Sequence, residues 1–235
     1  MADKNIEVTD AREGGGGSRP RGRPRQITRP DIVSAARGVP PEALTMQAVA
    51  DVLGVDPKAL NYHVGDRDGL RALVALDVFE SELRAVALPD DGDWRLIVRL
   101  YARALHDAVV KLGVLAFYFR LPESGLGALA PVERVLQALV DAGCSIAQAG
   151  DSLQLISELG HAAGRSQVIV ARARVHPNVR EIESVLTTAD PNAFPILRQM
   201  VAEGYSAGAV DDEARRLDFY LDVVIAGIEK VLASA

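Results

Sequence analysis

Apolar side chains recur every three or four residues along most of the chain, which is the period of an amphipathic helix. From Thr28 onward, Gly, Pro and capping residues cut this pattern into four short segments before a break at Pro89–Gly92. No strand pattern or internal repeat stands out. The sequence therefore predicts an all-α fold, with a small unit of short helices ahead of a larger helical body. In that body we predict helices near 93–112, 114–120, 130–142, 146–174, 194–203 and 211–232, with "VHPNVR" and "TTADPNAFP" as connections.

The stretch "TMQAVADVLGVDPKALNYHV" at residues 45–64 has the spacing of a helix-turn-helix. Ala50 is small where the two helices would cross, and Gly54 can adopt the positive φ that the tight turn demands. Val55 and Leu60 would fill the angle between the helices. The opposite face of the second helix could then enter a major groove. Groups able to bond bases or phosphates lie there: Lys58, Asn61, Tyr62 and His63, with Arg67 just beyond.

Each of these features also has a purely structural interpretation. The two helices could be an ordinary hairpin in an all-α core. His63 could be a structural histidine, Tyr62 could pack against the first helix, and Lys58 could be a solvated surface charge. A further helix precedes the pair and begins at a capping box formed by Thr28 and Asp31. Because this preceding helix and the helix pair together make a three-helix packing unit, the DNA-binding interpretation is favoured.

The run "TMQAVADVLGVDPKALNYHVGDRDGL", residues 45–70, resembles the TetR family of transcriptional regulators. The resemblance implies an all-α fold with three DNA-binding helices, a linking fourth helix, and a larger body that binds a ligand and dimerises. We therefore expect a helix-turn-helix DNA-binding domain at 28–75. The ligand-binding and dimerisation domain is expected at 76–235.

The resemblance also suggests roles for single residues. It places Thr45 at a helix N-terminus that contacts a phosphate, which the helix dipole favours independently. Gln47 would lie near a base edge and could bond adenine, and Arg67 replaces the Lys that the family usually has near a phosphate. The chain departs from the family at Asn61, where Tyr is common, and its own Tyr62 comes one place later. Asn61 could read adenine or cap a neighbour, so the preferred DNA sequence stays open.

Charge is segregated along the chain, whose formal net charge is −6. Between Gly14 and Pro30 every charged residue is Arg. We expect residues 1–27 to be a flexible basic arm, because this composition buries no apolar surface. "RGRP" in this arm resembles the core of an AT-hook, which would place Arg21, Arg23 and Arg25 at a minor groove. The alternatives are a solvated tail, or a cloning linker at Gly14–Ser18.

Polar and aromatic groups in the otherwise apolar body are the candidates for an effector site. A plain core or surface role is equally compatible with each of them. We expect His106 and Asp107 to point to different helix sectors and to form no dyad. An effector held by these groups would be partly apolar. The candidate residues are His106, Phe117, Tyr118, Arg120, His161 and Arg165.

The family resemblance implies a homodimer formed by the helices near 146–174 and 211–232. Small residues at Gly160, Ala163 and Gly164 would permit close approach of helices at such an interface. The alternative is that these apolar stripes serve the core of a single protomer.

Other functions find little support in the sequence. It shows no metal-ligand cluster, no phosphate loop and no nucleophile paired with a base, so we expect no cofactor, no metal and no enzymatic activity. One cysteine allows no intramolecular disulfide, and no signal peptide or membrane span stands out, which fits the cytoplasm. We expect a repressor that binds a palindromic double-stranded operator and is released by a small molecule. The alternatives are a helical enzyme or small-molecule-binding protein whose helix-turn-helix is only structural, and an architectural DNA protein that uses the arm alone.

Overall fold

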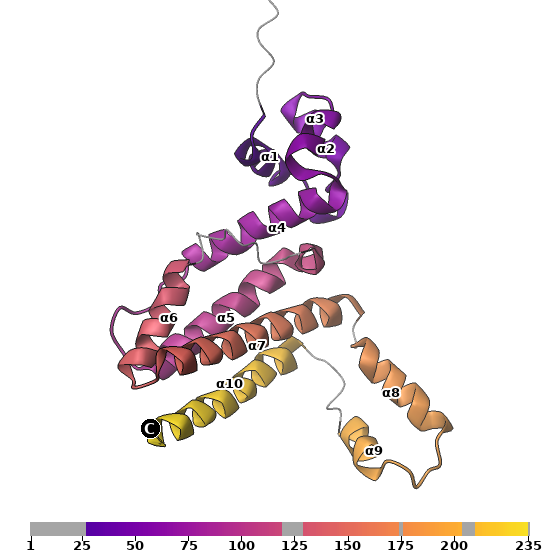
Figure 1. Cartoon of the computed structure of the whole chain (residues 1–235). Coiled ribbons are helices and arrows are strands. Elements are labelled where there is room, and N and C mark those ends of the chain that lie inside the picture. Colours follow the sequence, from indigo (N-terminus) through magenta and orange to yellow (C-terminus); the bar gives the residue numbers. More distant parts are fainter. Residues whose placement is uncertain (1–26, 119–128, 174–175, 204–209, 235) are drawn as a thin grey trace, which may run out of the picture.

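The computed structural model describes residues 27–118, 129–173, 176–203 and 210–234. Within these residues the regular elements are all helices, with no strand (Figure 1), so the predicted all-α fold is confirmed. The N-terminal elements are α1 (Arg29–Ala36), η1 (Pro41–Ala43), α2 (Met46–Leu53), α3 (Lys58–Val64) and α4 (Arg67–Arg84). The remaining elements are α5 (Trp94–Leu112), η2 (Gly113–Phe117), α6 (Leu129–Asp141), α7 (Ile146–Ala173), α8 (Pro177–Thr188), α9 (Pro195–Ala202) and α10 (Val210–Ala233).

Local capping sets the helix boundaries of the N-terminal unit. Thr28 and Asp31 form the predicted capping box of α1, with the Thr28 backbone N–H 3.0 Å from an Asp31 carboxylate oxygen. Thr45 caps α2, and Gly54 ends it at φ 69°, a left-handed conformation that glycine adopts without strain. At α3 the Asp56 carboxylate accepts a hydrogen bond from the Lys58 backbone N–H at 2.8 Å. These caps satisfy backbone groups that helix ends leave unpaired.

The core of the N-terminal unit is the one that the helix-turn-helix pattern predicts. Ala50 and Leu60 are fully buried, together with Ile32 of α1 and Leu70 of α4. The small Ala50 lies on α2, which packs against α1, and Leu60 of α3 is buried in the same cluster. This packing leaves the opposite face of α3 in solvent.

Helix α4 links this unit to the body. Leu70 near its first turn belongs to the N-terminal packing, whereas Phe79 and Leu83 in its second half are buried against the body. One continuous set of buried residues runs from α1 to α10. Figure 1 shows α4 lying between the two parts of the molecule.

Helices α5 and α7 make the closest contact in the body. A Cβ added at Gly160 would lie 2.8 Å from the Ala102 carbonyl oxygen, and one added at Gly164 would lie 2.8 Å from that of His106. The suggestion that these small residues serve a dimer interface was therefore wrong. They are used within the protomer, because the backbones of α5 and α7 pass too close for any side chain at these points.

A row of ion pairs joins α5 to α10. Three arginines spaced four residues apart on α5 face three acidic residues on α10. The pairs are Arg95–Glu229 at 2.6 Å, Arg99–Asp222, and Arg103–Asp218 at 2.6 Å. The apolar face of α10 packs inward through Leu217, Leu221, Ile225 and Ile228.

Two local predictions were wrong. "VHPNVR" was expected to be a connection, but α8 begins there at Pro177, because His176 caps it through a hydrogen bond from the Asn178 backbone N–H at 3.3 Å. The helix expected near 114–120 is instead a 3-10 helix at Gly113–Phe117, and Arg120 lies outside the described residues. Figure 1 shows α8 and α9 standing apart from the other helices. No helix of the described chain is long and apolar enough to cross a membrane.

Candidate functional site

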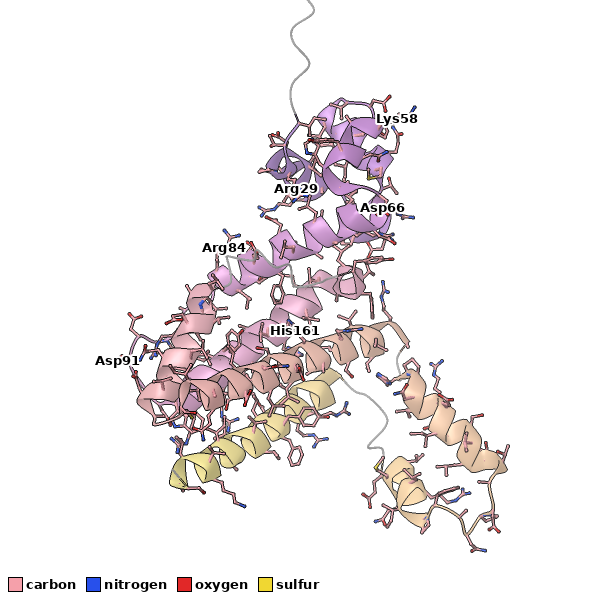
Figure 2. The ribbon with its side chains drawn as sticks, in the orientation of Figure 1. Arg29, Lys58, Asp66, Arg84, Asp91 and His161 are labelled. Carbon is pink, nitrogen blue, oxygen red and sulfur yellow. The ribbon has the colours of Figure 1, made fainter. Side chains whose placement is uncertain are left out.

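The outer face of α3 is an exposed polar surface. Tyr62 is 91% exposed, so the alternative that it packs against the first helix is excluded. Its ring meets the ring of His63 edge-on, with 5.2 Å between centroids. Lys58 and Asn61 are exposed beside it, and the Asn61 side chain makes no hydrogen bond to any described residue. Figure 2 marks Lys58 at the outer end of the N-terminal unit.

Other candidate DNA contacts already have partners within the unit. The Thr45 hydroxyl accepts a hydrogen bond from the Ala48 backbone N–H at 3.1 Å. The Gln47 amide donates to an Asp51 carboxylate oxygen at 2.6 Å, so it must leave that partner to reach a base. Arg67 donates through Nε to the Leu44 carbonyl oxygen at 3.4 Å, and its two terminal nitrogens make no hydrogen bond to any described residue.

Arg29 is a candidate that the sequence analysis missed. Its Nε donates to the His63 carbonyl oxygen at 3.2 Å, which ties the start of α1 to the end of α3. Its exposed guanidinium therefore lies near the C-terminal end of α3. The sequence could have indicated Arg29, because it is a basic residue in the first turn of the helix that precedes the helix-turn-helix. The arm residues Arg21, Arg23 and Arg25 lie outside the described residues.

Several candidate effector residues meet where α4, η2 and α7 converge. On α7, the His161 ring lies 5.4 Å from the ring of Phe79 on α4. One turn further, the guanidinium carbon of Arg165 lies 5.9 Å from the ring centre of Phe117. Figure 2 marks His161 on α7. Burial, with a smaller contribution from Arg165, lowers the pKa of His161, which favours a neutral imidazole.

Tyr118 connects this cluster to the helix that carries the DNA-binding unit. Its hydroxyl accepts a hydrogen bond from an Arg71 terminal nitrogen at 2.7 Å. The same guanidinium stacks over the Tyr118 ring, 4.6 Å from its centre. Sequence reasoning missed both Arg71 and Phe79, because their contacts join segments that are far apart in the chain.

His106 lies on α5 and is buried. Its Nδ1 lies 2.8 Å from an Asp107 carboxylate oxygen, so the expectation that the two residues form no pair was wrong. Neighbouring positions on a helix do diverge, but the short Asp107 side chain, 77% exposed, bends back to the ring edge. The buried Nε2 of His106 has no hydrogen-bond partner among the described residues. It is the kind of buried polar atom that a bound polar group or water satisfies.

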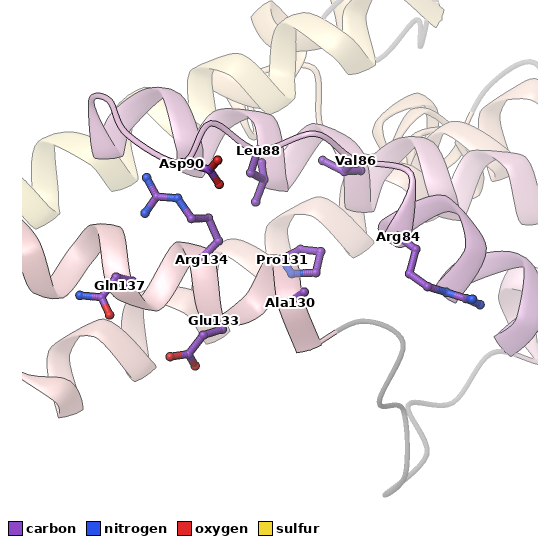
Figure 3. A pocket seen from close by; sticks show the side chains of 9 residues that line it. All are labelled: Arg84, Val86, Leu88, Asp90, Ala130, Pro131, Glu133, Arg134 and Gln137. Carbon is purple, nitrogen blue, oxygen red and sulfur yellow. The ribbon is translucent and has the colours of Figure 1, made fainter.

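A surface groove of about 520 Å³ opens between the α4–α5 connection and α6 (Figure 3). Val86, Leu88 and Pro131 form its apolar part, and the Arg134 guanidinium donates through Nε to the Pro89 carbonyl oxygen at 2.6 Å. The described effector candidates do not line this groove. In the described part of the chain, no group of His, Cys, Asp and Glu residues is arranged to hold a metal ion.

A helix-turn-helix with an exposed polar face, joined by one helix to an all-α body, defines the class of helix-turn-helix transcriptional regulators with a sensory body. Residues 87–232 match the protein family described as "Tetracyclin repressor-like, C-terminal domain". The chain belongs to this family, the TetR family of regulators.

Solved structures of regulators resemble the whole fold. Apo ActR from Streptomyces coelicolor is 25% identical, with a TM-score of 0.66 over 89% of this chain and 98% of that one. ActR in complex with actinorhodin is 25% identical, with a TM-score of 0.63 over 87% and 96%. TetR from Acinetobacter baumannii AYE, at 21% identity and a TM-score of 0.56 over 88% and 98%, shares the fold.

Proposed function

We propose that this protein is a ligand-responsive transcriptional repressor that binds a palindromic double-stranded operator and leaves it when a small molecule binds the body. The carrying observation is the outer face of α3, where Lys58, Asn61 and the 91% exposed Tyr62 stand in solvent. An exposed aromatic side chain beside an amide and an ammonium group can contact base edges and phosphates, whereas in this exposed position it contributes little to packing of the fold. Enzymatic activity is no part of the proposal.

The contacts divide by chemistry. Lys58, Thr45 and Arg67 would bind phosphates, because cations and free N–H groups at helix starts favour anions. Asn61 and Gln47 would read base edges, while Tyr62 and His63 would contact either. Arg21, Arg23 and Arg25 would add minor-groove contacts.

The effector site would lie at the junction of α4, η2 and α7. Phe117 and Phe79 give it apolar surface, and His161 and Arg165 give it polar groups. We include His106, whose buried Nε2 needs a partner, and Arg120 from the sequence. ActR has been solved with actinorhodin, which supports a small-molecule effector for this chain as well.

The effector signal would reach the DNA-binding unit through α4. A ligand that displaces η2 must disturb the contact between Tyr118 and Arg71 described above. That contact lies only four residues after Arg67 at the start of α4. A shift there changes the separation of the two recognition helices in a dimer.

The dimer would form through α7 and α10. Leu155 on α7, with 46% exposure, and Phe219 and Val223 on α10, with 60% and 57%, remain on the outer side of these helices after the inner core is complete. Two such faces related by a twofold axis would make a four-helix bundle. A Leu155→Asp and Val223→Asp variant should sediment as a monomer and lose palindrome binding.

The direct experiment is a band shift with the DNA upstream of the protein's own coding sequence at moderate salt. We expect one saturable complex that a half-site competitor displaces poorly and the full palindrome displaces well. Equal competition by unrelated DNA would refute sequence-specific regulation. Lys58→Ala with Tyr62→Ala should abolish the complex, whereas Lys111→Ala on α5, an exposed cation outside α3 and the proposed dimer face, serves as a surface control.

A further inference from the structure

The N-terminal unit has a groove that the contacts proposed above do not use. It has a volume of about 410 Å³ and opens beside the turn of the helix-turn-helix. Ile27, Leu53, Val55 and Ala59 supply its apolar surface, and Asp31 and Asp56 supply carboxylates. Because no basic residue of the described chain lines it, the groove is an apolar trough with negative charge.

The basic arm reaches this groove by its position in the chain. Ile27 is both a lining residue and the residue that directly follows Arg21–Gln26. Six residues from Arg21 to Gln26 can span at most about 20 Å, so every arginine of "RGRPRQ" stays within reach. Tethering over so short a distance gives an effective concentration on the order of millimolar, so contacts too weak to hold a free peptide can be occupied.

The chemistry of the arm complements the groove. Guanidinium groups form bidentate pairs with carboxylates, and each carboxylate offers about four acceptor positions, so the capping bonds of Asp56 leave acceptor capacity. Pro24 offers an apolar ring on a stiff backbone, which suits a shallow apolar trough. An acidic groove would repel the DNA backbone, so it favours this basic occupant over a phosphate.

We propose that, without DNA, the segment Arg21–Gln26 docks in this groove of its own chain, and that DNA must displace it before the arm can enter a minor groove. The arm is then shared between two competing acidic partners, the groove and the DNA. Weak, nonspecific DNA competes poorly for it, whereas an operator gains enough contacts to capture it. The DNA-dependent half of this inference rests on the proposed function, but the docking itself does not.

Docking can be tested without DNA by comparing backbone amide resonances of the full chain with those of Arg21→Ser/Arg23→Ser/Arg25→Ser. We expect shifts concentrated at Leu53–Ala59 that disappear in Asp56→Asn and at about 0.5 M salt, where charges are screened within a few ångströms. Asn also caps helices, so this variant keeps α3. Asp51→Asn, two residues before the lining residue Leu53, is the matched control and should keep the shifts. Superimposable spectra at low salt would overturn the proposal.

The competition is then measured with nonspecific DNA. In the chain with the native arm, Asp56→Asn removes one exposed ion pair that holds the arm in the groove, so DNA binding should tighten. This gain should be about threefold larger than the gain that the same substitution gives in the triple serine variant. Equal tightening in both arms would mean that the carboxylate acts on DNA directly, and would refute the competition. If the resonances shift but no DNA binds, docking stands and the proposed function fails.

Discussion

Replacing Gly164 with alanine is a direct test of how closely α5 and α7 approach. The new methyl group would lie 2.8 Å from the His106 carbonyl oxygen and 2.8 Å from the Val109 Cβ. Neither atom can rotate away, because one belongs to the backbone and the other is fixed to it. The helices must therefore separate by several tenths of an ångström along their contact.

The expected magnitude follows from two opposing terms. Alanine in a helix interior is favoured over glycine by about 1 kcal/mol, whereas overpacking a tight core costs about 1–3 kcal/mol. Since the obstructing atoms are immobile, we expect the upper half of that range. The net loss in the free energy of unfolding should be about 1–2 kcal/mol, or about 3–6 °C in Tm for a chain of this size.

Gly150→Ala on the same helix is the matched control. A Cβ there meets nothing within 4 Å, so only the helix-propensity gain remains and the protein should be stabilised by about 1 kcal/mol. Both variants and the wild type are unfolded in urea at one protomer concentration, because dimerisation would otherwise change the apparent stability. If Gly164→Ala proves as stable as Gly150→Ala, the described separation of α5 and α7 is wrong.

Four further predictions test the DNA-binding surface and the cluster near η2. Lys58→Ala should weaken binding to all DNA sequences alike and reduce the slope of log binding constant against log salt concentration by about one. Tyr62→Ala should weaken the operator complex without changing Tm. A lower Tm for Tyr62→Ala would indicate that this side chain packs in the fold. Tyr118→Phe removes a hydrogen bond to a charged group but keeps the ring under the guanidinium, so we expect a loss of about 1–2 kcal/mol in urea unfolding, and an unchanged midpoint would refute the contact. Because the pKa of His161 is lowered in the folded state, the unfolded chain binds its proton first, so stability should fall as pH drops below about 6.5, where an unfolded histidine titrates. His161→Gln should flatten that part of the stability curve, and identical curves would contradict the burial of His161.

Local rules predicted the N-terminal unit well. Caps at Thr28, Thr45 and Gly54 depend on neighbouring residues, and the structure confirms all three. The burial of Ala50 and Leu60 follows from the spacing of the helix-turn-helix alone. Sequence reasoning succeeds here because each interaction spans only a few residues.

The body was harder to predict, because its contacts join distant segments. The sequence shows that Gly164 is small, but not that α5 rather than a second protomer occupies the space above it. Arg71 and Tyr118 are 47 residues apart, and nothing near either residue indicates the other. The prediction that His106 and Asp107 form no pair failed for another reason. Helical geometry fixes the direction of each Cβ but not the conformation of the side chain beyond it.

The length of α4 has a mechanical consequence. Its 18 residues make a rod about 27 Å long, with the body gripping one end through Phe79 and Leu83 and the DNA-binding unit fixed to the other. A tilt of about 5° at the body end would sweep the far end through about 2 Å over that length. Two protomers tilting in opposite senses would change the distance between their α3 helices by about 4 Å, against the roughly 34 Å between successive major grooves. A rigid rod would therefore convert a small rotation where Phe79 and Leu83 pack into a mismatch that a DNA duplex can register.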